Sequence, residues 1–226
     1  RSEEALVSVA AEVRQRGGTA AVVAADLEPP GAAEALADRL AAAGETVDVL
    51  VNNAGFGVQG PFLAAPAETA EGMIGLNVTA LTSLTRRLLP GMVARGRGGV
   101  LTVASVAAFG PAPRFAVYAA TKAYVLSLTE ALHAELRHTG VHVSCLSPGP
   151  VATGFADRAG MASAFFDGAL PVGRVARAGL DGLAANRRSV VPGALNKAQA
   201  AAARVGPPAL VLRVAEAIMR RADPGV

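Results

Sequence analysis

The sequence predicts a single α/β domain in which helices cover both faces of a doubly wound parallel β-sheet, giving three αβα layers. Short apolar runs that suit buried strands alternate with longer stretches in which apolar residues recur at helical spacing. Such alternation is typical of a parallel sheet with crossover helices. The 226 residues are 52% hydrophobic, which is enough for one core, and no repeat or low-complexity linker divides residues 1–226.

The first part of the chain predicts two helices and two strands. Residues 2–16 have the pattern of an amphipathic helix that ends at Gly17-Gly18. An apolar run predicts a buried strand over residues 20–25, and a second helix is expected over residues 32–43. The run at residues 47–51 predicts the next strand.

The middle of the chain continues this alternation. Apolar residues at helical spacing predict one long helix or two over residues 67–95. A strand bounded by glycine is expected over residues 99–104, a helix over residues 116–137 and a further strand over residues 141–146.

The last part of the chain is less regular. Residues 154–170 show little helix or strand order but carry four large apolar side chains, namely Phe155, Met161, Phe165 and Phe166. Either a mobile lid over an apolar substrate or the packing of a short helix explains them. A final strand is expected over residues 189–191, and residues 198–221 predict one or two helices divided at Pro207-Pro208.

Tyr118 and Lys122 are candidate catalytic residues. They lie four residues apart in the helix predicted over residues 116–137, so their side chains leave one face a turn apart. A free tyrosine has a pKa near ~10, and a catalytic tyrosine needs its anion stabilised by ~3 pKa units, or ~4 kcal/mol. A cation ~4 Å away at an effective dielectric of ~20 supplies ~4 kcal/mol. Lys122 is therefore expected to lower the pKa of Tyr118.

Ser105 follows the strand predicted over residues 99–104, so it lies at a carboxyl edge, where open α/β sheets bind ligands. Its hydroxyl would hold a substrate oxygen for Tyr118. The common alternatives are a core tyrosine beside a solvated lysine, and a turn serine. The combination with other motifs in a fixed order argues against these alternatives. Those motifs are Asn52-Asn53-Ala54-Gly55 after one strand, Asn77 in an intervening helix, and Pro148-Gly149-Pro150-Val151-Ala152-Thr153 after another strand.

Together these motifs make the sequence resemble the short-chain dehydrogenase/reductase family, most specifically over residues 26–153. The resemblance implies a Rossmann-like fold, a nicotinamide cofactor, and interconversion of a hydroxyl and a carbonyl by hydride transfer. It assigns Tyr118 as the general acid/base, Lys122 as the residue that lowers its pKa and binds the nicotinamide ribose, and Ser105 as the holder of the substrate oxygen. Asn77 would hold a water that connects Lys122 to solvent.

The resemblance also assigns cofactor and subunit contacts. Asp26 would hydrogen-bond the adenine. Arg1 falls where some members place an arginine against the NADP 2′-phosphate, which gives NADP a mild preference over NAD, although a solvated chain terminus also explains this residue. The long helices at Asn77 and Tyr118 would form a homo-dimer or homo-tetramer. The small residues of Asn53-Ala54-Gly55 would let the backbone approach the adenine-side ribose. Val151 and Thr153, after the turn that contains Pro148 and Gly149, would contact the carboxamide of the nicotinamide.

Two features near the start of the chain depart from a complete dinucleotide-binding pattern. Residues 55–60 match G-x-G-x-x-G, but Pro61-Phe62 follow in place of an opening helix, and no strand ends in an acid about 20 residues on, so we reject that interpretation. The first two strands of the family and its phosphate-binding turn have no counterpart in this sequence. The strand over residues 20–25 would then lack its neighbours. The sequence is therefore expected to be a fragment or to come from an incomplete gene prediction, with a truncated domain that folds as such as the less favoured alternative. Asn52 is expected to hydrogen-bond neighbouring strand ends.

Composition argues against several other classes. The net charge is only +3 and the arginines are scattered, which is not the pattern of a nucleic-acid surface. Cys145 lies in a predicted strand and is expected to be a buried thiol. The three histidines show no metal-ligand spacing. There is no signal-peptide pattern and no apolar run of ~18 residues, so a cytoplasmic protein without a transmembrane segment is expected.

Two rivals to the oxidoreductase stay open. One is a non-catalytic member of the same fold, or an inactive fragment, that binds a nucleotide or a partner. The other is a serine hydrolase, which the lack of G-x-S-x-G and S-x-x-K motifs disfavours. If the chain is an oxidoreductase, Phe109, Phe115 and Phe165 favour a small apolar or aromatic carbonyl compound or alcohol as substrate, although such a pocket would suit many ligands.

Overall fold

The computed structural model describes residues 2–222, without the side chains of residues 157, 163 and 164. Its centre is a parallel sheet of four strands in the order β1-β2-β3-β4. The register places Leu50 beside Val100 and Val100 beside Val143. The predicted parallel α/β fold is therefore confirmed, and its strands are β1 (Val49–Asn52), β2 (Gly98–Val103), β3 (Val141–Leu146) and β4 (Ser189–Val190).

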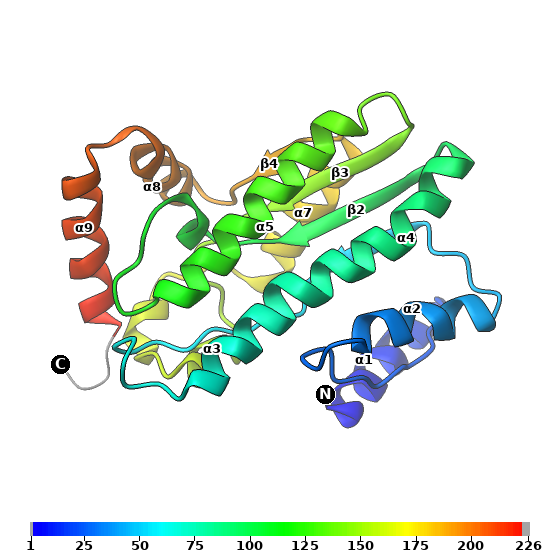
Figure 1. Cartoon of the computed structure of the whole chain (residues 1–226), viewed down its shortest axis with the longest axis horizontal. Helices are drawn as coiled ribbons and strands as arrows, with labels where there is room; N and C mark the ends of the chain where they lie inside the picture. Colours follow the sequence, from blue (N-terminus) through cyan, green and yellow to red (C-terminus); the bar gives the residue numbers. More distant parts are fainter. Residues whose placement is uncertain (1, 223–226) are drawn as a thin grey trace.

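Helices cover both faces of the sheet, as Figure 1 shows. α4 and α5 pack on one face, with α2 against α4, while α7 packs on the other face. Three shorter turns are a π-helical segment η1 (Gly75–Ala80) and two 3-10 segments, η2 (Val106–Phe109) and η3 (Ser163–Phe166). The helices are α1 (Glu3–Gln15), α2 (Ala32–Ala42), α3 (Ala67–Ile74), α4 (Leu81–Arg95), α5 (Ala116–Glu135), α6 (Phe155–Ala159), α7 (Val172–Ala184), α8 (Ala194–Val205) and α9 (Pro208–Arg221).

The two sheet faces are separated by the alternation of side chains along β3. Val143 packs with Met92 and Val100 under α4 and α5, and Cys145 packs with Val125 of α5. Leu146 points the other way and packs with Val175 and Leu183 of α7. Successive side chains of a strand leave opposite faces, so β3 is buried on both sides as a central parallel strand should be.

Two glycines let α7 approach the sheet closely. A Cβ atom on Gly179 would lie 2.8 Å from Leu146 Cδ2, and one on Gly182 would collide with Val190. α7 was not predicted from the sequence, in which these glycines weaken the helical signal. Close packing against the sheet compensates for that low propensity.

The strand predicted over residues 20–25 is wrong. Residues 18–26 form irregular backbone, and no strand among residues 2–222 pairs with the outer edge of β1. Arg14 Nη2 donates to the Ala20 carbonyl at 2.6 Å, which ties this segment to α1. A strand needs a neighbour to satisfy its backbone groups, so an apolar run without one does not become a strand.

The remaining predictions hold with small shifts in bounds. The stretch over residues 67–95 is divided, because the π-helical segment η1 separates α3 from α4. The loosely ordered residues 154–170 contain only the short elements α6 and η3. The C-terminal pair of helices divides at Pro207-Pro208 as expected, although α8 already begins at Ala194.

Candidate active site

A cavity of about 980 Å³ opens at the carboxyl edge of β2 and β3, beside α5. Its far walls come from α8, α9 and the segment that contains α6 and η3, which lie together in Figure 1. Most of the predicted site residues line it, and these are Asn53, Gly55, Ser105, Tyr118, Lys122, Pro148, Gly149, Val151 and Thr153. The topology therefore brings together residues that are up to a hundred positions apart in the sequence.

Tyr118 is buried, with 7% of its surface exposed. Its ring stacks on Phe115 at a centroid distance of 4.3 Å, and Phe155 lies 5.5 Å away. Gly57 backs the ring, because a Cβ atom there would lie 2.6 Å from Tyr118 Cδ2. Burial raises the pKa of Tyr118 to about 12, and the hydrogen bond from the Ser105 hydroxyl offsets part of this rise.

Lys122 is also buried, with 5% of its surface exposed. Its Nζ donates to the Val103 carbonyl at 2.8 Å and lies 5.6 Å from the centroid of the Tyr118 ring. Burial lowers the pKa of Lys122 to about 8, and the Cys145 thiol acts in the opposite direction. The pKa of Tyr118 lies above its usual value because of burial, and the expectation that Lys122 lowers it stays a prediction. Both groups are desolvated, so each favours its neutral form.

Ser105 lies directly beyond the end of β2, as predicted. It is the N-cap of η2, and its Oγ accepts a hydrogen bond from the Ala107 N–H at 3.2 Å. This bond fixes the hydroxyl oxygen beside Tyr118, and the single hydroxyl proton points to the Tyr118 oxygen.

Asn77 lies in the π-helical segment η1 behind the cavity, with only 1% of its surface exposed. Its Oδ1 accepts from the Phe56 N–H at 3.1 Å, and its Nδ2 donates to the Phe56 carbonyl at 2.9 Å. The same Nδ2 donates to Thr121 Oγ1 at 3.0 Å, and Thr121 donates to the Tyr118 carbonyl at 2.7 Å. Asn77 thus clamps the loop after β1 to α5. Its expected role in holding a water stays a prediction.

The other predicted residues lie apart from these groups. Asp26 accepts from the Glu28 N–H at 3.1 Å and does not line the cavity. Ala54 is exposed in the loop after β1, between two residues that do line it. Arg1 lies outside the described residues.

The prediction for Asn52 is wrong. Its Nδ2 donates to Thr85 Oγ1 of α4 at 2.9 Å instead of bonding a neighbouring strand end. Both residues are buried, so the bond satisfies two polar groups that are shielded from water. The rejection of residues 55–60 as a dinucleotide fingerprint is confirmed, because no helix begins there. The Gln59 N–H instead donates to the Ala159 carbonyl at 2.9 Å and the Gly60 N–H to the Arg114 carbonyl at 2.8 Å.

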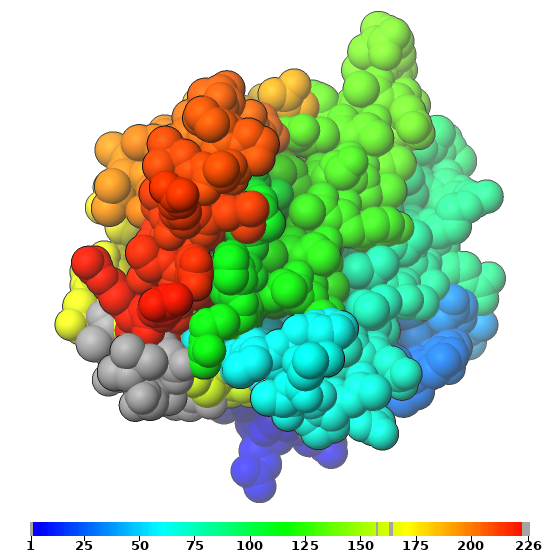
Figure 2. All heavy atoms as spheres, turned by 60° about the vertical axis from the view of Figure 1, so that its left-hand side comes forward, coloured from blue at the N-terminus to red at the C-terminus, as the bar shows by residue number. Residues whose placement is uncertain are grey.

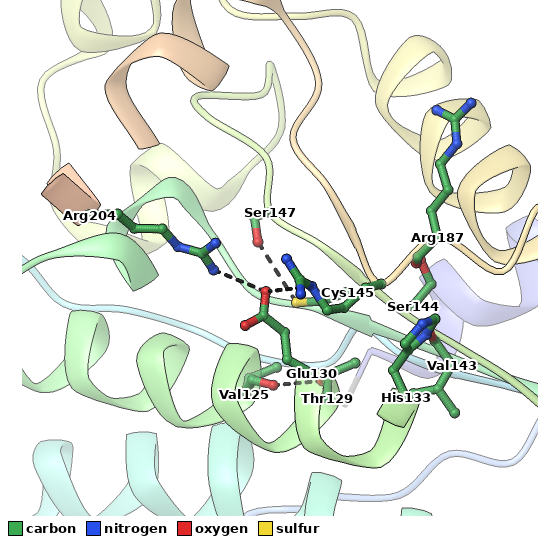
Figure 3. Close-up of polar contacts among 11 residues, drawn as sticks. Val125, Thr129, Glu130, His133, Val143, Ser144, Cys145, Ser147, Arg187 and Arg204 are labelled. Carbon is green, nitrogen blue, oxygen red and sulfur yellow. Dashed lines mark hydrogen bonds and ion pairs between the residues drawn. The ribbon is translucent and has the colours of Figure 1, made fainter. Parts of the chain in front are cut away.

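A second set of polar contacts lies farther along α5, toward its C-terminal end, and is drawn in Figure 3. Glu130 of α5 accepts from Arg204 of α8 at 3.0 Å and pairs with Arg188 at 3.4 Å. The Arg204 guanidinium also lies 4.8 Å from the centroid of the Phe109 ring, at the end of η2. α8, which forms one cavity wall, is thereby tied to the two elements that carry Ser105 and Tyr118.

Cys145 is a buried thiol, as expected, whereas His142, which was expected on a helix surface or in a loop, lies in β3. Cys145 is fully buried, burial raises its pKa, and its Sγ lies 3.8 Å from Ser147 Oγ. His133 Nδ1 bonds the Val143 carbonyl at 2.8 Å (Figure 3), and His142 Nδ1 bonds the Leu183 carbonyl at 3.0 Å. Within the described part of the chain, no cluster of three or more histidine, cysteine or acidic residues could hold a metal. Nor is any described helix long and apolar enough to cross a bilayer.

Sequence reasoning did not find the C-terminal walls of the cavity. α9 turns Val211, Ala215 and Ile218 toward it, and α8 contributes Ala202 and Ala203. The amphipathic pattern of residues 208–221 indicates that one face of this helix is covered, but it cannot say by what. That information depends on tertiary packing.

Comparison with known proteins decides the family. A family model for short chain dehydrogenases matches residues 1–162, which include Asn77, Ser105, Tyr118 and Lys122. The chain belongs to the short-chain dehydrogenase family.

Two curated relatives illustrate how this short-chain dehydrogenase compares in sequence. It is 36% identical over 160 residues to a very-long-chain 3-oxoacyl-CoA reductase from Anas platyrhynchos, an alignment that covers 68% of this chain and 50% of the relative. It is 34% identical over 152 residues to the probable oxidoreductase EphD of Mycobacterium tuberculosis, which covers 67% of this chain and 26% of the relative. The chain thus spans half or less of the length of these relatives.

Solved structures of short-chain dehydrogenases share the Rossmann fold of this chain. A short-chain dehydrogenase from Sphingobium yanoikuyae in complex with NADPH superimposes with a TM-score of 0.80 at 32% identity, covering 86% of this chain and 76% of that one. A family member from Burkholderia phymatum in complex with NAD gives a TM-score of 0.75 at 27% identity, covering 88% and 80%.

Proposed function

We propose that this short-chain dehydrogenase is an NAD(P)-dependent oxidoreductase that interconverts a carbonyl and a hydroxyl. The observation that carries the proposal is the placement of Ser105, Tyr118 and Lys122 on one cavity at the carboxyl edge of the sheet, with both titratable side chains buried. Burying a phenol and an ammonium costs stability, and such perturbed groups in a cleft are typical of functional sites.

The residues beside Lys122 fit a nicotinamide nucleotide. Gly55 leaves its backbone open toward the lysine, since a Cβ atom there would lie 3.4 Å from Lys122 Nζ and 2.8 Å from Asn77 Oδ1. Lys122 would hold the nicotinamide ribose, and the segment at Asn53 would lie against the adenine-side ribose. Val151 and Thr153 would contact the carboxamide. When bound, the nicotinamide supplies or accepts the hydride. Either NADP or NAD suits this arrangement, and Arg1 and Asp26 would contact the adenosine part, with NADP as our preference.

The side chains of this site are suited to giving a proton. Because burial raises the pKa of Tyr118 to about 12, the phenol is protonated at neutral pH and can donate to the oxygen of a carbonyl that is being reduced. Ser105 would hold the same oxygen. Lys122, with its pKa at about 8, is largely cationic at pH 7 and would stabilise the phenolate left behind. A protonated phenol is the form that reduction of a carbonyl needs.

A titration of the purified chain with NADPH and NADH, followed by the fluorescence of the reduced nicotinamide, tests the proposal. We expect binding of at least one nucleotide, and oxidation of it when a ketone is added. Tyr118→Phe should abolish the oxidation and keep the binding. Absence of nucleotide binding would contradict the proposal.

A second candidate is a non-catalytic member that binds a nucleotide or a partner. It is favoured by one observation, namely that residues 55–60 form an irregular loop and offer no helix N-terminus for a pyrophosphate. Nucleotide binding without turnover of any ketone, in both the unmodified protein and Tyr118→Phe, would select this candidate.

We also propose that two copies associate through α4 and α5. The helices present partly exposed apolar side chains, namely Val93 and Tyr124 at 37% and 39% exposure. Size-exclusion chromatography with light scattering would test this, and a monomer at micromolar concentration would contradict it.

A further inference from the structure

The cavity has an apolar rim as well as an apolar interior. Five apolar residues line it and yet remain at least half exposed to solvent, and they are Val172 (50%), Leu195 (72%), Val205 (86%), Leu210 (55%) and Val214 (50%). Four of them belong to α8 and α9, which Figure 2 shows in orange and red on the surface of the molecule. We call these five residues the apolar rim. Exposed apolar side chains grouped around a cavity are characteristic of a ligand-binding groove.

The interior of the cavity offers few charges to a ligand. Among the described residues that line it, only Lys122 and Asp167 carry charge. Lys122 already donates to the Val103 carbonyl, and Asp167 is exposed. The walls between Tyr118 and the rim are apolar, and they include Phe115, Phe165, Phe166, Leu170, Ile218 and Met219. A charged group placed inside would lose its hydration without gaining a partner.

The wall that α9 provides is anchored near both of its ends. Near its start, Val211 packs on Gly110, where a Cβ atom would lie 3.2 Å from Val211 Cγ1. Near its end, Gln59 Nε2 donates to the Met219 carbonyl at 3.3 Å, and the Ala162 N–H donates to the Ala222 carbonyl at 2.9 Å. Between these anchors the apolar face of α9 turns to the cavity. The apolar surface is therefore held open as a preformed site.

We infer that the substrate is an uncharged ketone, or the matching secondary alcohol, whose aliphatic or polycyclic part extends from Tyr118 to the apolar rim. The inference deepens the proposed function and rests on it. In the reduction, the carbonyl carbon would receive the hydride that a reduced nicotinamide supplies, and Tyr118 would give a proton to the carbonyl oxygen. The products are a secondary alcohol and the oxidised nucleotide, and a proton from solvent restores Tyr118.

The test compares ligands of one chemistry and increasing length. Displacement of the neutral dye Nile red from the purified protein by 2-butanone, 2-octanone and 2-decanone measures binding without turnover, and 9-oxodecanoate serves as the charged analogue of 2-decanone. Each added methylene should tighten binding about threefold to fourfold as long as it is buried. The oxodecanoate should bind at least tenfold more weakly than 2-decanone.

Two variants of α9 test where the alkyl chain of the ketone lies. Val214→Ser changes the rim, whereas Leu212→Ser changes a residue of α9 that is 42% exposed and does not line the cavity. We expect Val214→Ser to weaken the binding of 2-decanone about fivefold and to leave the binding of 2-butanone unchanged. Leu212→Ser should change the binding of neither ketone. Equal affinity for all three ketones, equal binding of the oxodecanoate, or equal effects of the two variants would overturn the inference.

The same measurements separate this inference from the proposed function. Ketones that bind with the expected length dependence but are never reduced by NADPH or NADH would support the apolar site and contradict the oxidoreductase. Reduction of all three ketones with one value of kcat/KM would support the oxidoreductase and overturn the inference. A loss of Nile red displacement by the ketones as the protein concentration rises would also overturn the inference. A second copy of the chain would then occupy the apolar rim.

Discussion

Lys122 of α5 is bound to the Val103 carbonyl, the last residue of β2, at 2.8 Å. Ser105 follows two residues later. The ammonium is therefore held by the same strand end that positions the serine, and its place does not depend on the phenol of Tyr118. This explains how the structure keeps a cation in a nearly closed part of the cavity.

The buried lysine makes stability depend on pH. The pKa of Lys122 is about 8 in the folded chain against 10.5 for an ordinary lysine, so the folded state loses the proton first and the free energy of unfolding rises with pH between these values. The rise should be about 3 kcal/mol, at ~1.4 kcal/mol per pKa unit. Urea unfolding from pH 7 to pH 10.5 should show that Lys122→Met loses this rise.

The pH dependence of the free energy of unfolding has to be compared between variants, because other buried groups change it in the opposite direction. The pKa values of Tyr118 and Cys145 are raised by burial, so their contributions to stability decline as pH rises above their ordinary values. Lys197, which is exposed on α8, provides the control. A Lys197→Met protein should keep the full pH dependence, and an unchanged profile in Lys122→Met would contradict the prediction.

Removing the phenol oxygen of Tyr118 should abolish catalysis without unfolding the chain. Tyr118→Phe keeps the stack on Phe115, and a lost general acid typically lowers kcat by about 10²- to 10⁴-fold. Tyr124→Phe is the matched control, since the Tyr124 hydroxyl contacts only Thr82 Oγ1, at 3.0 Å, among the described residues. Steady-state rates of ketone reduction should fall for the first variant alone. A Tyr118→Phe enzyme with near-normal rates would rule out the assigned role.

The lack of a side chain at Gly57 leaves room for the Tyr118 ring. In Gly57→Ala the new methyl group would lie 2.6 Å from Tyr118 Cδ2 and 2.8 Å from Phe115 Cζ, so the rings must move. We expect kcat to fall by at least tenfold, because misplacement of about 1 Å is enough for such losses. Gly154→Ala, which has open space around the added atom, should be neutral in the same assay. Similar losses in both variants would show that Gly57 has no special role.

The contact between Arg204 and Glu130 should affect substrate binding more than chemistry. Arg204→Gln removes both the ion pair and the packing on Phe109, at a cost of about 1 kcal/mol in unfolding free energy. α8 then loses a tie to α5, so KM should rise a few-fold while kcat is nearly kept. Arg220→Gln, which breaks an ion pair within α9, is the control for KM. A fall in kcat with constant KM would contradict a role in shaping the wall.

Local patterns were enough to select three side chains that the fold brings to one cavity. The four-residue spacing of Tyr118 and Lys122 and the position of Ser105 after an apolar run are signals within short segments, and the structure places all three on one cavity. The protonation states were not predictable in this way. They depend on burial, which is set by residues such as Phe155 that lie far along the chain.

Long-range packing also explains the errors in the fold. An apolar run at residues 20–25 is a strand only if another strand lies beside it, and the described chain places none there. Asn77 interrupts an apolar helical run in the sequence, and its side chain bonds Phe56, which is 21 positions away. The contribution of α9 to the cavity depends on the path of the chain after Pro207-Pro208, about which helical periodicity carries no information.

The π-helical segment η1 has a consequence for the spacing of buried residues before and after it. Met73, Asn77, Leu81 and Thr85 are all buried and follow one another in steps of four residues. Three such steps span twelve residues, whereas three turns of an α-helix take about 10.8. The wider turn absorbs the surplus residue and keeps Asn77 and Thr85 in phase with the core. This stretch should therefore tolerate a change of residue better than the loss of one, since a single deletion would rotate one half of it by about 100° against the other.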